Sequence, residues 1–302
     1  MIALILVTGA TGFLGTYLIP RLVENGYKVR CLVRQSSDTS LLKRLNVETT
    51  YGDITDKTSI EASLDNVDII VHLATVLNSS DASIYEVNVK GAENLIDAVK
   101  NKKREIRKII MLSSATVLKN TLHLSYPKTK LMAETLFLNS GLNCIVIRPT
   151  WIYGKGSKSF GNLIKNIKKL PFIPVIGNGQ ARMQPVYVDD VIHLILLLID
   201  NIHLRNKIYH IGGSSALSFD ELLNGVSDDL EIKKIKIHIP IFIAKMVMTA
   251  CKMFSIKPPI SDDFISDVTQ DVVVDNSALK EEFNFVPISF EEGFKAYGRY
   301  LE

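Results

Sequence analysis

The sequence has few of the features that mark extracellular, membrane-spanning or nucleic-acid-binding proteins. Its three cysteines, Cys31, Cys144 and Cys251, are scattered and odd in number, which argues against a disulfide framework, and no Cys/His pair has metal-ligand spacing. No stretch reaches the ~20 apolar residues of a membrane span, and MIALILVTGA lacks the basic flank of a secretory signal. A net charge of +3 is too small to indicate a nucleic-acid partner. We expect a cytoplasmic protein without a bound metal or an integral membrane span.

Two local concentrations of residues suggest a partner, and each has a simpler interpretation. Residues 100–108 hold six Lys or Arg residues without aromatic interleaving, which favours a solvated helix end over a polyanion site. Residues 239–256 form an apolar segment that Lys245 and Lys252 interrupt. This pattern favours a buried or docking helix, with a helix lying on a membrane surface as the alternative.

Short apolar runs alternate with helical patterns through the first half of the chain. Strands are predicted at 2–8, 28–33, 47–51, 68–73, 108–113 and 143–148, and helices at 12–25, 82–100 and 125–140. Strands that alternate with crossover helices predict a parallel sheet covered on both faces. The expected fold is an α/β, doubly wound Rossmann domain.

The pattern changes after Pro149. Gly and Pro become frequent between residues 154 and 185, so short elements are expected there. Beyond them, helices are predicted at 189–200, 218–228, 241–254 and near 290–300, and strands at 186–188, 207–211 and 233–239. We therefore expect a cofactor-binding domain at 1–150 and a smaller substrate lobe at 151–302, with residues 186–212 packing back on the first domain.

A glycine-rich turn, TGATGFLG, follows the first predicted strand and opens a helix. Gly9 permits a tight turn, Gly12 lets the backbone approach a pyrophosphate, and Gly15 lets the helix pack closely on the sheet. The phosphate would lie on backbone N–H groups at the positive helix end, beside Thr11, Phe13 and Leu14. The alternative is a glycine-rich turn with a structural role only.

The end of the second predicted strand favours NADP(H) over NAD(H). An acidic residue there would bind the ribose 2′-hydroxyl, but no carboxylate occurs before Asp38. Arg34 can instead stack on adenine and pair with a 2′-phosphate, with Ser36 or Ser37 adding hydroxyl donors. The alternative is that Arg34 is simply solvent-exposed.

Asp53 ends the third predicted strand, at the sheet edge where adenine would lie. Its carboxylate could accept the adenine amino hydrogens while Ile54 packs on the ring. Asp53 could equally cap the following helix, because Thr55 and Asp56 crowd the same turn.

Tyr126 and Lys130 are four residues apart at the start of a predicted helix, so both lie on one face. A phenol with a pKa near ~10 is a poor acid or base at neutral pH, and a nearby ammonium favours the phenolate. Ser113 and Ser114 end the fifth predicted strand, at the same edge of the sheet. A serine hydroxyl there can hold a substrate oxygen. The alternative for Tyr126 is an aromatic residue that packs where the two domains meet.

These motifs, with VNVKGAENL, IRPTWIYG and PVYVDDV in the same order, resemble an extended short-chain dehydrogenase/reductase of the NAD-dependent epimerase/dehydratase family. The resemblance implies Tyr126 as general acid/base, Lys130 on the nicotinamide ribose and Ser114 on the substrate oxygen. It also implies further cofactor contacts at Leu73, Ala74, Thr75, Asn88, Pro149 and Ile152. Our candidates for substrate contacts are Thr116, Trp151, Tyr153 and Gln184. A hydrogen-bonded helix residue is the alternative for Asn88, and a homodimer is expected from the resemblance alone.

The chain departs from sugar-nucleotide epimerases at two places. Only residues 115–125 separate the strand serine from the tyrosine region, so the substrate-covering loop is short. Met183, Gln184 and Pro185 stand where such enzymes usually carry an arginine and an acidic-aromatic pair. GNGQARMQPVYVDDV resembles the atypical branch that includes an accessory subunit of respiratory complex I. We expect an NAD(P)-dependent oxidoreductase or epimerase with a small-molecule substrate, and the alternative is a non-catalytic NADPH-binding structural or sensor protein.

His72 and His193 lie in apolar surroundings in the sequence. For both, a hydrogen-bonded core histidine is favoured over a catalytic one.

Overall fold

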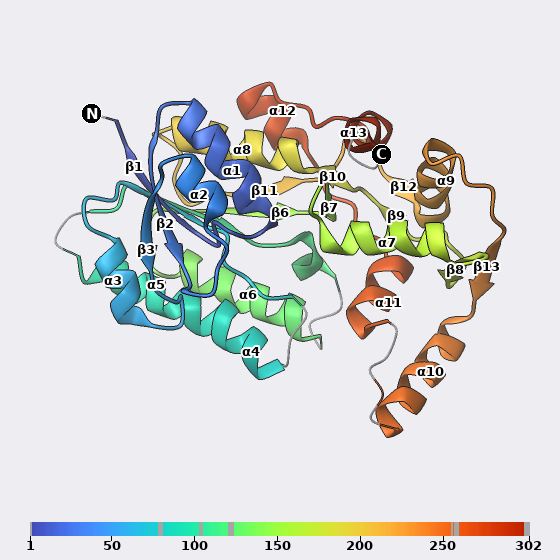
Figure 1. The fold of residues 1–302 in the computed structure, drawn as a ribbon. Coiled ribbons are helices and arrows are strands. Elements are labelled where there is room, and N and C mark those ends of the chain that lie inside the picture. Colours follow the sequence, from blue (N-terminus) through green and yellow to red (C-terminus); the bar gives the residue numbers. More distant parts are fainter. Residues whose placement is uncertain are drawn as a thin grey trace. The chain divides into compact units, whose positions relative to one another are not determined.

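The computed structural model describes residues 2–77, 81–102, 105–119, 124–254, 256 and 260–298. Its chain divides into two compact units (Figure 1). The first comprises Met1–Val117, Ser125–Pro149 and Val188–His210. The second comprises Leu118–Leu124, Thr150–Tyr187 and Ile211–Glu302. Each unit is built from segments that are not contiguous in the sequence.

The first unit contains a sheet and the helices that cover it. In chain order its elements are β1 (Leu4–Thr8), α1 (Phe13–Glu24), β2 (Lys28–Val33), α2 (Ser40–Arg44), β3 (Glu48–Tyr51), α3 (Lys57–Ser63), β4 (Ile69–His72), α4 (Asp81–Tyr85), the π-helical turn η1 (Glu86–Lys90), α5 (Gly91–Lys100), β5 (Lys108–Leu112), the 3₁₀ turn η2 (Ala115–Leu118), α6 (Ser125–Leu138), β6 (Cys144–Pro149), α8 (Val188–Asp200) and β11 (Ile208–Ile211).

The seven strands of this sheet have the order β11-β6-β5-β4-β1-β2-β3. All pairs from β3 to β6 are parallel. The chain moves outward from β1 to β3 and then returns to β4 on the other side of β1, so the strand order reverses between β1 and β4. This is the strand order of a Rossmann fold, and the crevice at such a reversal is where these folds bind ligands.

The central strands form because their apolar runs are buried on both faces. All residues of β4 and β5 are buried, as are five of the six residues of β6. Helices α5 and α6 lie on one side of the sheet, and α1 with α8 on the other (Figure 1). Continuous rather than alternating hydrophobicity is the expected signature of a parallel sheet covered twice.

The predicted helix at 82–100 is three pieces. Residues Asp81–Tyr85 are α-helical, Glu86–Lys90 form the π-helical turn, and Gly91–Lys100 are α-helical again. Single π-helical turns inside α-helices are frequent at functional sites. Asn88, a predicted cofactor contact, lies in this turn.

Two expectations for the first unit are wrong. Lys108 is not part of a solvated basic helix end: it is buried, and its Nζ donates hydrogen bonds to the carbonyls of Leu198 and Asn201 at the end of α8. These carbonyls have no partner within the helix, so a cation stabilises them. His193 lies on α8 but is exposed rather than in the core.

The second unit is made of short strand pairs and helices. Its elements are β7 (Ile152–Tyr153), α7 (Lys158–Lys169), β8 (Ile173–Ile176), β9 (Arg182–Met183), β10 (Val186–Tyr187), β12 (Leu217–Ser218), α9 (Phe219–Asp229), β13 (Lys236–Ile239), α10 (Ile241–Met253), α11 (Asp262–Thr269), α12 (Ser277–Phe283) and α13 (Phe290–Gly298). The strands pair as β7 with β10, β9 with β12, and β8 with β13.

Helix α7 was not predicted, because the density of Gly and Pro around it pointed to short elements. Its twelve residues bury Phe160, Ile164 and Ile167, which are spaced as one face of a helix. Phe160 joins an aromatic core with Tyr153, Phe290 and other rings, at centroid separations of 5.2–6.1 Å. No helix within the described residues is long and apolar enough to cross a membrane.

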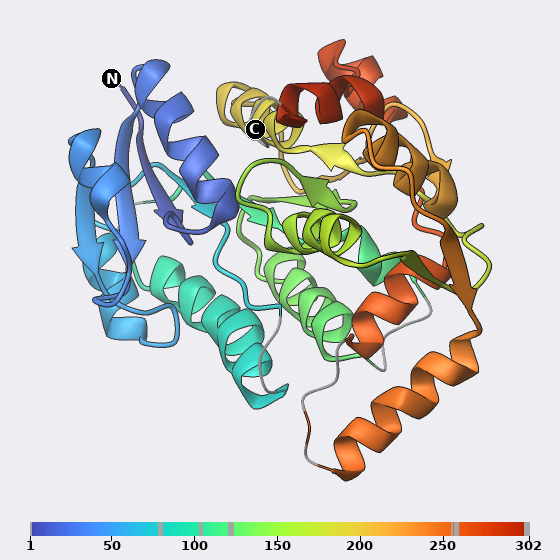
Figure 2. The same ribbon diagram turned by 45° about the vertical axis from the view of Figure 1, so that its right-hand side comes forward.

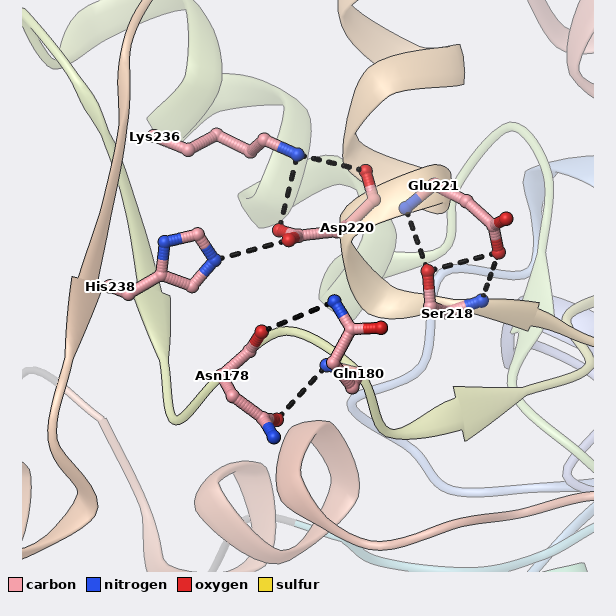
Figure 3. A network of polar contacts seen from close by, with 7 residues as sticks. All are labelled: Asn178, Gln180, Ser218, Asp220, Glu221, Lys236 and His238. Atoms are coloured by element: carbon pink, nitrogen blue, oxygen red, sulfur yellow. Dashed lines mark hydrogen bonds and ion pairs between the residues drawn. The ribbon is translucent and has the colours of Figure 1, made fainter.

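A polar network fixes the strand β13 in the second unit (Figure 3). Asp220, in the first turn of α9, pairs with Lys236 at 3.2 Å and with His238 at 3.1 Å, both on β13. Ser218 and Glu221 form a capping box at the start of α9, which holds this end of the helix. The network therefore ties β13 to a well-capped helix.

Candidate functional site

The glycine turn between β1 and α1 has a shape that only glycine permits at its first position. Gly9 has a φ of +73°, and the Gly12 amide donates a 3.0 Å hydrogen bond to the Gly9 carbonyl. A Cβ on Gly9 would stand 2.7 Å from backbone atoms of Leu73 and Ala74, in the loop that follows β4. The turn therefore lies against the end of β4, where the strand order reverses.

No capping or acidic side chain occupies the backbone N–H groups in the first turn of α1. Gly12 is the N-cap and supplies no side-chain hydrogen bond, and no acidic residue occurs in the first turn. Phe13, Leu14 and Gly15 are the first residues of the helix, where backbone N–H groups have no partner within the helix. These donors and the positive helix end suit a phosphate, so the turn, with Thr11 in it, fits a dinucleotide pyrophosphate.

Gly15 has a different packing role from the predicted one. A Cβ there would meet the carbonyl oxygen of Ala10 at 2.2 Å, so this glycine lets α1 pack on the turn itself rather than on the sheet. Beneath the turn, the Thr8 hydroxyl and His72 Nδ1 share a 2.8 Å hydrogen bond. Burial lowers the pKa of His72 to about 3. His72 is therefore a neutral core histidine that joins β1 to β4.

Arg34 follows β2 and is exposed. Its side chain makes no hydrogen bond or ion pair with another described residue. Asp38, the next carboxylate, accepts hydrogen bonds from the amide and hydroxyl of Ser40, at 2.9 and 2.6 Å, and these bonds lower its pKa. Asp38 is thus engaged in the loop before α2, while the arginine beside the strand end is available to a ligand.

Asp53 does not cap the helix that follows it. Its Oδ1 accepts hydrogen bonds from the amide and hydroxyl of Thr55, both at 2.9 Å, whereas Asp56 is the residue that caps α3. The N-cap alternative for Asp53 is therefore wrong. Ile54 is buried beneath Gly91, whose missing Cβ would lie 3.0 Å from it.

Asn88 joins three segments of the first unit. Its Oδ1 accepts from the Val76 amide at 2.9 Å and from the Thr75 hydroxyl at 3.1 Å. Its Nδ2 donates to the Val76 carbonyl at 3.1 Å and to the Thr129 hydroxyl at 3.2 Å. The π-helical turn thus fixes the loop after β4 to helix α6, which carries Tyr126.

Lys130 is buried on α6, with 3% of its surface exposed. Its Nζ donates a 2.5 Å hydrogen bond to the Leu112 carbonyl at the end of β5. Loss of solvation lowers the pKa of Lys130 to about 8, although the Glu134 carboxylate opposes this shift. Tyr126 is half-buried one turn earlier on the same helix. Because Lys130 is poorly solvated, its positive charge is weakly screened and acts strongly on neighbouring groups.

Helix α6 also carries one partner of a buried ion pair that was not predicted. Glu134, with 1% of its surface exposed, pairs with Arg148 of β6 and accepts a 2.8 Å hydrogen bond from the Ser113 hydroxyl. Glu134 stands four residues after Lys130, which could have indicated a third charged residue on that helix face. Arg148 also stands out in the sequence, because it is a charged residue within an apolar strand and would need a buried partner.

The two adjacent serines have different partners. Ser113 is engaged by Glu134, whereas the Ser114 hydroxyl lies 2.9 Å from that of Thr116 and accepts the Thr116 amide at 3.2 Å. Ser114 directly precedes the 3₁₀ turn η2 and lies at the carboxyl end of β5. Ser114, unlike Ser113, makes no hydrogen bond to the buried Glu134–Arg148 ion pair.

In the second unit, one of the predicted substrate contacts lies in the core. Tyr153 has no exposed surface, and its hydroxyl donates to the Phe290 carbonyl at 3.2 Å. The prediction that it contacts substrate is wrong, because the aromatic core encloses it. Trp151 is half-buried and donates to the Ser159 hydroxyl at 2.9 Å, and Ile152 beside it is half-buried on β7.

Gln184 also has a structural place. Its Nε2 donates to the Gly213 carbonyl at 2.6 Å, and its Oε1 accepts the Val274 amide at 2.9 Å. Because both ends of this buried amide are engaged, the prediction that Gln184 contacts substrate is wrong. Pro149 ends β6 in the first unit.

The strand order and the glycine turn place the first unit in the Rossmann class of folds. The sequence matches the model of the NAD dependent epimerase/dehydratase family over residues 5–212. The chain belongs to this family, so its class is that of NAD(P)-dependent epimerases, dehydratases and related oxidoreductases. The fold and the family that the sequence predicted are both confirmed.

Three similar proteins illustrate the range of the family. A mitochondrial NADH dehydrogenase alpha subcomplex subunit 9 from Dictyostelium discoideum is 28% identical over 90% of this chain and 77% of its own length. A UDP-glucose 4-epimerase from Vibrio cholerae is 26% identical over 96% of this chain and 93% of its own. A crystal structure of UDP-glucose 4-epimerase from Thermotoga maritima shares the fold, with a TM-score of 0.78, 22% identity and coverage of 99% and 98%.

Proposed function

We propose that this protein is an NADP(H)-dependent oxidoreductase or epimerase that acts on a hydroxyl or carbonyl carbon of a small molecule. The observation that carries the proposal is the open first turn of α1, whose backbone donors suit a pyrophosphate. The same unit holds Lys130, a buried cation one helical turn from Tyr126. Family membership supports the same class of activity.

The cofactor is proposed to lie across the carboxyl ends of the strands of the first unit. The residues proposed to hold it are Gly9, Thr11, Gly12, Phe13, Leu14, Gly15, Arg34, Asp53, Ile54, Leu73, Ala74, Thr75, Tyr126, Lys130 and Pro149. Asn88, whose amide is engaged at both ends, is proposed to position the loop after β4 rather than to touch the cofactor. Arg34 is proposed to select NADP(H), because an exposed guanidinium at this strand end can pair with a 2′-phosphate in two-point geometry.

The proposed chemistry divides between cofactor and protein. When bound, the nicotinamide supplies hydride transfer to or from a substrate carbon. Tyr126 takes the proton from the substrate hydroxyl, or returns it to the carbonyl oxygen, as general base or acid. Lys130 favours the phenolate through its positive charge. Ser114 donates a hydrogen bond that holds the substrate oxygen beside the tyrosine.

A nucleoside-diphosphate sugar is the first substrate class to test, because one relative is a UDP-glucose 4-epimerase. The assay supplies UDP-glucose with NADP⁺ or NAD⁺, and a panel of simple aldehydes and ketones with NADPH. Tyr126→Phe should lower turnover by about 10²- to 10⁴-fold, because the proton transfer is lost, while NADPH affinity should fall by no more than about tenfold, the effect of losing one hydrogen bond.

The matched control is Tyr297→Phe, which removes a hydroxyl from a buried ring of the second unit. Turnover in this control should equal that of the wild type. Full activity in Tyr126→Phe would contradict the proposed role of the tyrosine.

A second candidate function is non-catalytic binding of NADPH in a larger assembly. The observation that favours it is the similarity to a subunit of mitochondrial NADH dehydrogenase. The short segment between Ser114 and Ser125 supports it too, because little chain is left to cover a substrate. This candidate predicts NADPH that stays bound through gel filtration and no turnover with any compound of the panel. NADPH oxidation with a simple aldehyde or ketone would exclude it.

A further inference from the structure

Helix α10 of the second unit exposes an unusual number of large apolar side chains. Phe242, Met246 and Met253 are 63%, 66% and 76% exposed. Ile243 and Val247 are exposed as well. A single exposed hydrophobic residue is ordinary, but a contiguous set on one helix marks an interaction surface. This helix was expected to be buried or to dock, and within the described residues nothing covers its apolar side.

The exposed residues form one side of the helix. At 100° per residue, Phe242, Met246 and Met253 fall within an arc of about 40°, and Ile243 and Val247 extend this arc. Among the α10 residues whose burial the structure describes, only Ala244 and Met248, one turn apart on another side, are buried. We call the five exposed residues the α10 apolar face.

The base of α10 is held firmly. The helix begins at Ile241, directly after β13, which pairs in parallel with β8. The Asp220 network fixes β13 through Lys236 and His238 (Figure 3). Figure 2 shows α10 running on from the end of β13. A helix anchored at one end presents its apolar face without needing to fold on contact, so little ordering entropy opposes docking.

The sequence around α10 is basic. Residues 232–261 contain no acidic residue and six lysines. Two of these lysines are engaged within the second unit, Lys236 with Asp220 and Lys234 with the carbonyls of Ile167 and Lys168. Lys245 is exposed on α10. It lies between the buried side of the helix and the α10 apolar face, where a long side chain can reach the level of lipid headgroups.

We propose that the α10 apolar face docks on the surface of a lipid bilayer that contains anionic phospholipids. The apolar side chains would enter the boundary between headgroups and acyl chains, and the exposed Lys245 would pair with a headgroup phosphate. A helix of 13 residues is too short to span a bilayer, so it would lie in the interface. A second copy of the chain is disfavoured as the occupant, because the lysines beside the α10 apolar face of one copy would repel those of the other. The proposal does not depend on the proposed catalytic function.

Co-sedimentation of the full chain with vesicles tests this proposal. One set of vesicles is phosphatidylcholine, and the other contains one-third phosphatidylglycerol. The wild type should bind the anionic vesicles more tightly, and added salt should weaken this binding. Phe242→Ser with Met246→Ser should weaken binding by about a hundredfold, because two large apolar side chains no longer enter the membrane. Lys245→Glu should weaken it at least about fivefold.

The matched control replaces exposed apolar residues away from α10. Ile202→Ser with Val286→Ser removes two side chains of comparable exposure and should leave vesicle binding unchanged. Since all these residues are on the surface, thermal unfolding and far-UV circular dichroism should match the wild type.

Three results would overturn the proposal. The first is failure of the wild type to bind either vesicle. The second is equal binding by the Phe242→Ser, Met246→Ser variant and the control. The third is self-association of the wild type in light scattering that the same variant abolishes, because a second copy would then be the occupant of the face.

Discussion

The ammonium group of Lys130 is buried and has lost most of its solvation. Its ammonium is buried against the Leu112 carbonyl, and burial lowers its pKa to about 8. Glu134, itself paired with Arg148, favours the charged form of Lys130. A group balanced in this way changes charge within the range where many enzymes work, whereas an exposed lysine does not.

This balance predicts a pH dependence of activity and stability. Proposed activity should fall as pH rises past about 8, because the positive charge that favours the Tyr126 phenolate is lost. Stability should change in the opposite sense. Since the folded pKa lies below the ordinary 10.5, the unfolded chain binds more protons between these two values, and the free energy of unfolding rises with pH there.

Urea denaturation of the wild type and of Lys130→Met, at pH values below 8 and near 10.5, tests the predicted rise in the free energy of unfolding. The wild type should gain about 3 kcal/mol relative to the variant across the window, from a shift of roughly two and a half pKa units. Parallel pH profiles for the two proteins would contradict this account of Lys130.

Glu134 should matter for stability more than any exposed ion pair. Glu134→Gln leaves the Arg148 guanidinium largely buried without its partner charge, which should lower the free energy of unfolding by about 3–5 kcal/mol. The control is Glu93→Gln, which removes an exposed pair with Lys90 and should cost less than about 0.5 kcal/mol. Equal urea midpoints for both variants would show that the buried pair contributes no more to the free energy of unfolding than the exposed pair does.

Among the elements of the fold, the turn between β1 and α1 depends most on a single residue type. Gly9→Ala adds a Cβ that meets the Leu73 and Ala74 backbone at 2.7 Å, at a φ of +73°. Unfolding free energy should fall by more than about 2 kcal/mol, and NADPH binding should be lost. Gly26→Ala is the control, because Gly26 has a φ of +79° with nothing within 4 Å. It should cost about 1 kcal/mol and leave binding intact, and equal effects of the two variants would contradict this reading of the turn.

The strands and longer helices of the first unit were predictable because their signals are local. The apolar runs of β1, β4 and β5 are continuous, and the glycine turn follows β1 directly. The π-helical turn was not predicted, because the segment 82–100 matches the apolar spacing of one α-helix well enough to hide a single five-residue turn at Glu86–Lys90. Helix α7 was missed although Phe160, Ile164 and Ile167 have helical spacing, since nearby Gly and Pro outweighed that pattern.

For the whole molecule, the sequence indicated the fold but not the partners of individual side chains. Alternating strands and helices predicted the doubly wound sheet, yet the burial of Tyr153 and the engaged amide of Gln184 depend on Phe290, Gly213 and Val274, far along the chain. Long-range contacts of this kind leave no periodic signal. A cytoplasmic setting and a homodimer stay predictions.

A fluorescence titration with NADPH and, separately, NADH tests the central claim, that the first unit binds NADP(H) at the open turn of α1. The wild type should bind NADPH at least about tenfold more tightly than NADH, and Arg34→Ala should abolish this preference, because a charge-assisted contact with the 2′-phosphate is lost. Equal affinity in the wild type would contradict the role of Arg34. Absence of binding to both dinucleotides, in protein freed of retained cofactor, would contradict the claim itself.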